Sequence, residues 1–141
     1  MKKEPIGKLI SYIHRQNQKN LAKYLSPYGL GSGGQHTFLK SVLQKPGITQ
    51  DQLTQLLKFD KATTARSIKL LEQSGYIERK PDPSDRRSHL LYPTTKAIEF
   101  APELQLMLDN YNKKLVHHLN PGEEDLLISL LQKINFELQD E

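Results

Sequence analysis

The sequence predicts a mainly α-helical fold with a small β wing, a winged helix-turn-helix with further helices on either side. Three observations predict it. Two short amphipathic segments lie between residues 49 and 74 and are separated only by Lys58-Phe59-Asp60. Two short β-prone runs, residues 76–80 and 89–92, follow directly and flank a basic loop that contains prolines. Longer segments with apolar residues at helical spacing occupy both ends of the chain.

The first short helix is expected to begin at a capping box. Thr49 and Gln52 have the T-x-x-Q spacing, in which each side chain bonds the backbone amide of the other residue. Leucines at positions 53, 56 and 57 then give this helix one apolar face. A supporting helix is expected from Gln35 to Gln44, and its apolar residues are Phe38, Leu39, Val42 and Leu43.

The second short helix has a start signal and a stop signal. The Asp60 carboxylate can accept from the free amides of the first turn, and Gly75 can take the left-handed conformation that ends a helix. The helix is therefore expected from about Lys61 to Ser74. Its narrow buried stripe is Thr64, Ile68 and Leu71. The opposite side is small and basic, as close approach to a duplex requires, and it carries Lys61, Ala62, Ala65, Arg66 and Lys69.

Between the two β-prone runs, the loop carries the triplet Asp85-Arg86-Arg87. One interpretation is a solvated turn whose ion pairs contribute little. The other is a DNA contact, in which Arg87, held by Asp85, enters a narrow minor groove whose negative potential attracts a guanidinium. Arg86 would then lie against a phosphate or the groove edge. We favour the second interpretation, because the second helix of such an arrangement lies in the neighbouring major groove.

Residues 47–97, GITQDQLTQLLKFDKATTARSIKLLEQSGYIERKPDPSDRRSHLLYPTTKA, resemble the DNA-binding lobe of the MarR (multiple antibiotic resistance regulator) family of transcription regulators. Asp85 and Arg87 match the family's D-x-R, and Thr94 matches the threonine that opens the following helix. Pro93 stands where the family usually has Leu, and Ala97 where it usually has Gly. The flanking helices extend the resemblance over nearly the whole chain. It implies a homodimer that binds an inverted-repeat operator in double-stranded DNA, most simply as a repressor relieved by a small-molecule effector.

The candidate DNA-binding residues therefore lie on the second short helix and on the wing. They are Lys61, Ala62, Thr63 and Ala65 near the bases, Arg66 and Lys69 at phosphates or base edges, and Asp85, Arg86 and Arg87 at the wing. The alternative is a winged-helix module that binds another protein and no operator. Such a module has no reason to keep a basic wing, so the wing favours DNA.

The expected organisation is a single unit over residues 1–141, with a DNA-binding lobe at 32–93 and dimerisation helices at 1–28 and 94–141. The flanking helices are expected at about residues 5–25, 95–119 and 121–138, with Pro102 kinking the second and Asn120 capping the third. Each is amphipathic and needs a partner. They could pack on one another within a monomer, whereas the resemblance implies that they interlock between two subunits.

Composition and charge agree with this interpretation. The 141 residues carry a formal net charge of +4, but residues 1–25 hold six Lys or Arg against one acid, and residues 121–141 hold one Lys against six acids. The N-terminal and central parts are thus the expected side for nucleic acid. No signal peptide and no long apolar run are present, so a cytoplasmic location is expected. The chain has no cysteine, which excludes disulfides and the thiolate sensing that some members of the family use.

Nothing in the sequence indicates an enzyme, a metal or a cofactor. No two of the five histidines have the i, i+4 spacing that places two imidazoles on one helical face. The glycines at 29, 31, 33 and 34 lack the lysine of a phosphate-binding loop and fit a flexible joint better. Ser, His and Asp occur without the context of a catalytic nucleophile. The sequence does not identify the effector, its pocket, the operator sequence, the regulated genes, or whether binding represses or activates.

Overall fold

A small antiparallel sheet and the helices beside it form the first of two compact units, residues 1–104; the second unit comprises residues 105–141. The computed structural model describes residues 3–31 and 34–134. The elements in chain order are α1 (Ile6–Leu25), the 3₁₀ turn η1 (Ser26–Tyr28), α2 (Gln35–Gln44), β1 (Ile48–Thr49), α3 (Gln50–Leu57), α4 (Lys61–Gln73), β2 (Ile77–Asp82), β3 (Asp85–Pro93), α5 (Thr95–Leu115) and α6 (Pro121–Ile134). The predicted fold class, mainly α with a small β wing, is confirmed.

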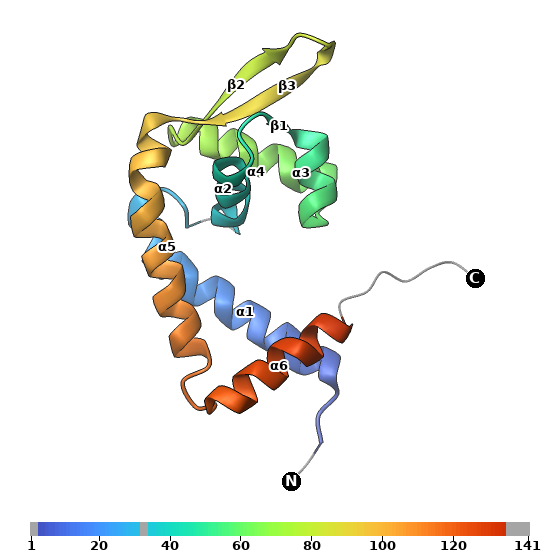
Figure 1. The fold of residues 1–141 in the computed structure, drawn as a ribbon, viewed down its shortest axis with the longest axis vertical. Helices are drawn as coiled ribbons and strands as arrows, with labels where there is room; N and C mark the ends of the chain where they lie inside the picture. Colours follow the sequence, from blue (N-terminus) through green and yellow to red (C-terminus); the bar gives the residue numbers. More distant parts are fainter. Residues whose placement is uncertain (1–2, 32–33, 135–141) are drawn as a thin grey trace, which may run out of the picture. The chain divides into compact units, whose positions relative to one another are not determined.

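Figure 1 shows the β2–β3 hairpin projecting beyond helices α2, α3 and α4 of the same unit. The strand order is β1-β3-β2, and both pairings are antiparallel. Beneath the sheet lies an apolar core in which the side chains are almost fully inaccessible. Its members in this unit include Phe38, Leu39, Val42, Leu53, Ile68, Leu71, Tyr76, Ile77 and Leu91. Burial of this apolar surface is the main source of the unit's stability.

The predicted helix signals are present as hydrogen bonds. The Gln52 amide donates to Thr49 Oγ1 at 3.1 Å, and the Thr49 amide donates to Gln52 Oε1 at 3.0 Å, which completes the capping box of α3. Lys58 has a φ of 59°, so the turn into α4 passes through the left-handed region. Gly75 has a φ of 81° directly after α4, as the stop signal predicted.

Several predicted boundaries were wrong. The sheet has a third strand, β1, whose two residues are too few to produce a recognisable period. The hairpin strands extend well past the predicted runs 76–80 and 89–92, because backbone pairing does not need apolar side chains. Helix α4 ends at Gln73, one residue before the predicted end, and α5 ends at Leu115 instead of Leu119. Helix α6 begins at Pro121 as predicted, but its expected end at Leu138 lies outside the described residues.

Two polar side-chain hydrogen bonds link the residues after α4 to the start of α5, and a third caps α5. Thr94 Oγ1 donates to the Gly75 carbonyl oxygen at 2.6 Å and accepts from the Ala97 amide at 3.3 Å, so one hydroxyl serves both helix ends. Lys96 Nζ donates to the Ser74 carbonyl oxygen at 2.6 Å. The last carbonyls and the first amides of helices need such partners. Within the described residues, no helix is both long and apolar enough to cross a membrane.

Replacing Thr94 with Val keeps the branched shape and removes both hydroxyl contacts. We expect the free energy of unfolding to fall by about 1–2 kcal/mol, because a helix cap and a hydrogen bond to Gly75 are lost together. Urea unfolding followed by circular dichroism measures the change. Thr95→Val is the matched control, since Thr95 is exposed and one residue away. Equal unfolding midpoints for the two variants would contradict this account of the junction.

Candidate nucleic-acid interface

Helix α4 presents its predicted DNA-facing side chains to solvent and buries the opposite stripe. Thr64, Ile68 and Leu71 are fully buried, as the helical period predicted. The Thr64 hydroxyl donates to the Asp60 carbonyl oxygen at 3.0 Å and accepts from Thr54 Oγ1 of α3 at 2.9 Å. These bonds fix the rotation of α4 on α3. The exposed residues on the outer side are Lys61, Ala62, Ala65, Arg66 and Lys69.

Thr63 differs from the other predicted residues of α4 because its polar groups are already bonded. Its amide donates to Asp60 Oδ1 at 2.6 Å, and its hydroxyl donates to Asp60 Oδ2 at 3.0 Å. The guanidinium of Arg66 also lies 3.5 Å from the Thr63 hydroxyl oxygen. The backbone N–H of Thr63, followed by its hydroxyl, lowers the pKa of Asp60 below its ordinary value. Thr63 is half-buried, and both its amide and its hydroxyl are bonded to the capping residue Asp60.

The tip of the wing is a bulge braced by two aspartates. Pairing is regular from Ile77 opposite Pro93 to Pro81 opposite His89, and then shifts so that Asp82 pairs with Asp85. The β3 residues between these two pairs, 86 to 88, consequently have no partner on β2 and bulge out of the ladder. The predicted loop thus shrinks to Pro83-Ser84, and the Asp85-Arg86-Arg87 triplet belongs to β3.

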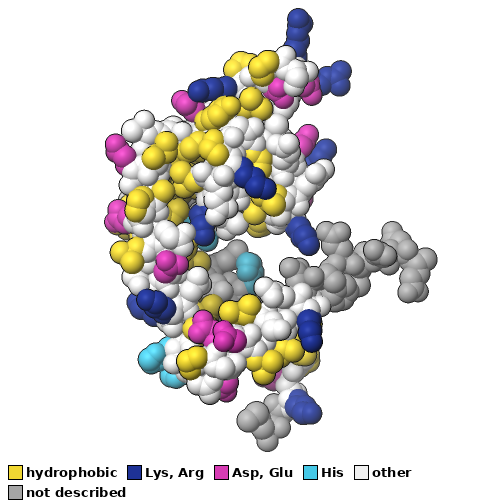
Figure 2. Space-filling view, in the orientation of Figure 1, with side chains coloured by type: hydrophobic (Ala, Val, Ile, Leu, Met, Phe, Trp, Pro, Cys, Tyr) yellow, Lys and Arg dark blue, Asp and Glu magenta, His cyan; other side chains and the backbone are white. Residues whose placement is uncertain are grey.

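Both aspartates bond backbone groups at this tip. Asp82 Oδ1 accepts from the Ser84 amide at 3.0 Å and from the Ser84 hydroxyl at 2.8 Å, and these bonds lower the pKa of Asp82. Asp85 Oδ1 accepts from the Arg87 backbone amide at 2.9 Å, so Asp85 holds the backbone of Arg87. The side chains of Arg86 and Arg87 are exposed. Lys and Arg side chains gather at the projecting end of the wing in Figure 2.

An ion pair that the sequence analysis missed links α4 to the wing. Arg79 Nε of β2 lies 2.5 Å from Glu72 Oε1 of α4, and both side chains are about one-third exposed. A charge-assisted bond at this separation orients the hairpin relative to the recognition helix. No local sequence signal indicates this pair, because it depends on how β2 lies against α4, and neither segment encodes that alone.

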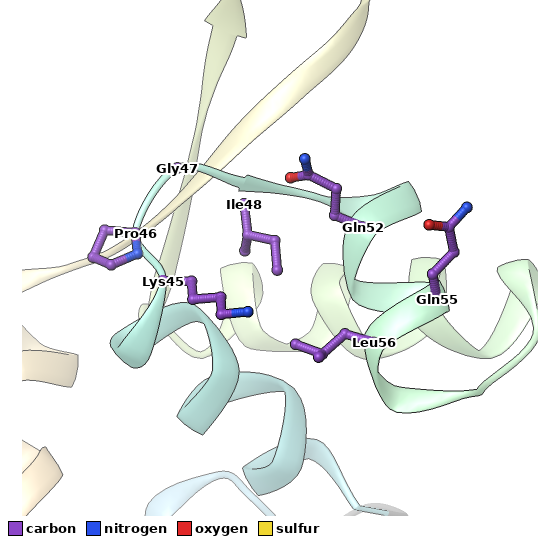
Figure 3. A pocket seen from close by; sticks show the side chains of 7 residues that line it. All are labelled: Lys45, Pro46, Gly47, Ile48, Gln52, Gln55 and Leu56. Carbon is purple, nitrogen blue, oxygen red and sulfur yellow. The ribbon is translucent and has the colours of Figure 1, made fainter.

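The hollows lined by described residues of this unit include the following two. Figure 3 shows the first, of ≈ 590 Å³, between the end of α2, β1 and α3, with Lys45, Gln52 and Gln55 around it. Its Gln52 side chain already serves the capping box. The second, of ≈ 260 Å³, lies between α1 and α2. Its polar lining residues are His14, Asn17, Gln18, His36 and Thr37.

In the second hollow, the imidazole of His36 has a shifted pKa. Burial, followed by the charge of Lys40, lowers its pKa from the ordinary histidine value. Apolar residues complete the lining, among them Leu21, Leu25 and Phe59. Several polar groups that converge in a partly apolar hollow are typical of a small-molecule site, whereas the first hollow has fewer.

A capped recognition helix with a small basic face, next to a braced basic hairpin, defines a winged helix-turn-helix DNA-binding protein. Comparison with known proteins agrees. The model of the MarR family matches residues 32–89. The HTH-type transcriptional regulator BilQ of Clostridioides difficile is 33% identical, with 74% of this chain and 75% of the relative covered. The multiple antibiotic resistance protein MarR of Escherichia coli K12 is 29% identical over 92% of this chain and 90% of its own.

The crystal structure of a MarR transcriptional regulator from Methanosarcina mazei Go1 superposes with a TM-score of 0.83 at 36% identity, covering 93% of this chain and 94% of that chain. The transcriptional regulator SlyA gives a TM-score of 0.86 at 28% identity, covering 93% and 92%. The chain belongs to the MarR family. It is a DNA-binding transcription regulator and not an enzyme.

The cap of α4 predicts a pH dependence of stability. Because the pKa of Asp60 is lowered on folding, its contribution is complete above the unfolded pKa and is lost as the pH falls through the folded pKa. In the variant Asp60→Asn the amide oxygen can still cap the helix but cannot titrate in this range. We therefore expect the free energy of unfolding of the wild type to fall more steeply than that of Asp60→Asn between about pH 5 and about pH 3. Urea unfolding at each pH tests this, and parallel curves would contradict it.

Proposed function

We propose that the protein is a homodimeric repressor that binds an inverted-repeat operator and is released by a small-molecule effector. The observation that carries the proposal is the outer side of α4, small and basic, beside the braced basic wing. An α-helix fits the major groove, and an arginine fits a narrow minor groove next to it. Since an operator lies on chromosomal DNA, we place the protein in the cytoplasm.

Each candidate residue has a role in this proposal. Lys61, Ala62 and Ala65 lie nearest the bases, and Arg66 and Lys69 bind phosphates or base edges. Thr63 contributes by fixing the cap, because its hydroxyl is bonded to Asp60. At the wing, Arg87 enters the minor groove with its backbone held by Asp85, and Arg86 binds phosphate. We assign residues 32–93 to the DNA-binding lobe on this basis.

The dimer accounts for the apolar faces of the terminal helices, and we assign residues 1–28 and 94–141 to it. Large apolar side chains on α1 are exposed, with Ile6 at 68% and Ile13 at 51%, and Leu126 on α6 is at 59%. The same helices expose Leu9, Ile10, Leu127, Leu130, Leu131 and Ile134. Several large apolar side chains exposed on one helix indicate an interface with another protein. A second copy related by a two-fold axis covers such surfaces and presents two identical α4 helices.

The effector is proposed to bind the hollow between α1 and α2. One side of this hollow is α1, which we assign to the dimer interface. The other side is α2, which supports the helix-turn-helix pair α3 and α4. A ligand there changes the separation of the two recognition helices, provided that it binds the DNA-free arrangement more tightly than the DNA-bound one. His14, His36 and Thr37 supply polar contacts that orient such a ligand.

A winged-helix module that binds a protein instead of an operator is the alternative. The protein partner of such a module would bind α4 or the wing, and apolar side chains there would be buried in the contact. The outer side of α4 instead offers lysine, arginine and alanine, and the wing tip offers two exposed arginines. Exposed cations on two adjacent elements fit a polyanion better.

Replacing Arg86 and Arg87 together with Ala tests the proposed function. We expect weaker binding to selected and to random duplexes alike, because these side chains contact backbone and minor groove and no unique base pattern. The slope of log affinity against log salt should become shallower by roughly one to two units. Fluorescence anisotropy over a salt series measures both quantities.

The matched control is the double variant Lys113→Ala/Lys133→Ala. It removes two cations that lie in the second unit, outside the DNA-binding lobe. We expect this control to keep the wild-type affinity and slope to within the error of the titration. Equal loss in both double variants would show that net charge alone drives binding, and no loss in the wing variant would refute the assignment of the wing.

A further inference from the structure

His89 lies on β3 of the wing, where regular pairing with β2 ends. It pairs with Pro81 at the last regular step of the β2–β3 ladder, immediately before the bulge that carries Arg86 and Arg87. Residues that pair across a ladder share a face, and alternate residues along a strand return to it. His89 therefore shares a face with Leu91, two residues along β3, and with Arg79, which pairs with Leu91.

That face is the one turned toward the helices. Leu91 is fully buried, and Arg79 reaches Glu72 of α4. His89, farther out along the same face, is exposed, and its side chain forms no hydrogen bond or ion pair with any residue that the structure describes. Its imidazole is thus free to bind a group that enters between α4 and the wing.

The proposed function determines which group enters there. If α4 lies in a major groove and the wing tip in the adjacent minor groove, the sugar-phosphate strand that separates the two grooves passes between them. A neighbouring negative charge favours the protonated form of an imidazole. We propose that His89 is a further DNA-contacting residue, whose imidazolium binds a phosphate of this strand, so that duplex binding takes up a proton. This inference rests on the proposed function.

None of the charged groups named around His89 is bonded to its imidazole. On β2, Arg79 is already paired with Glu72 of α4, and the directly opposite residue, Pro81, is uncharged. On β3, Arg86 and Arg87 add positive charge beyond it, with Asp85 bonded to the Arg87 amide. On the other edge, Thr49 of β1 pairs with the adjacent Leu90, and the first turn of α3 beyond it carries Asp51. Acids and bases thus occur together on the hairpin side, and Asp51 is the acid named on the β1 side. A bound phosphate adds further negative charge, which favours protonation.

The test is the pH dependence of binding to a fluorescently labelled duplex of random sequence, since phosphate contacts do not depend on base sequence. Histidine changes charge between about pH 5 and pH 8. At constant ionic strength, we expect the affinity of the wild type to rise by about three- to tenfold from about pH 8 to about pH 6. His89→Gln, which keeps a polar side chain but cannot titrate, should lose most of this rise.

Two further variants sharpen the result. His89→Lys carries a permanent charge and should bind at about pH 8 as tightly as the wild type binds at about pH 6. His117→Gln removes an exposed histidine outside the lobe and should retain the wild-type profile. The inference is overturned if His89→Gln follows the wild-type curve, or if His89→Lys binds no more tightly than His89→Gln at about pH 8.

The two proposals fail in different ways. If the wild type binds no duplex at either pH, both the proposed function and the role of His89 are rejected. If Arg86→Ala/Arg87→Ala weakens binding while His89→Gln leaves the pH profile unchanged, only the role of His89 is rejected.

Discussion

The hydrogen bonds at the two ends of α4 hold in place the surface that we propose reads DNA. At its start, Asp60 accepts from the amide and the hydroxyl of Thr63. At its end, Gly75 turns the chain, and its carbonyl oxygen accepts from Thr94 at the start of α5. A helix held at both ends cannot rotate without breaking a cap. The outer side that presents Arg66 and Lys69 therefore stays opposite the buried stripe, which is the geometry that a groove contact needs.

The wing depends on the same helix. Glu72, the second-last residue of α4, pairs with Arg79 of β2, so an ion pair links the hairpin to the helix that precedes it. The aspartates at the tip bond local backbone groups and shape the bulge that exposes Arg86 and Arg87. Both carboxylates accept hydrogen bonds from backbone amides of the tip and keep their negative charge. The exposed side chains of Arg86 and Arg87 add two positive charges to the same tip.

Local signals explain which parts of this structure could be predicted from the sequence. The starts of α3 and α4 follow from the caps that Thr49 and Asp60 supply, and Gly75 placed the end of α4 to within one residue. Strand β1, the bulge and the Arg79–Glu72 ion pair depend on the register between segments, which no single segment encodes. The terminal helices were predicted as amphipathic, but the number of chains that cover their apolar faces is not a property of one chain. The DNA roles of the nine candidate residues stay predictions.

We propose that two identical recognition helices, one from each subunit, read one operator. Selection from random duplexes should recover imperfect inverted repeats with half-site centres about one helical turn, roughly 10 base pairs, apart, so that both α4 helices meet the same side of the duplex. The decisive measurement is affinity after about five base pairs are inserted between the half-sites, which rotates one half-site to the far side. We expect affinity to fall toward the non-specific level, whereas a single base change costs only about 1–3 kcal/mol. Recovered sites without two-fold symmetry, or indifference to the insertion, would contradict the account.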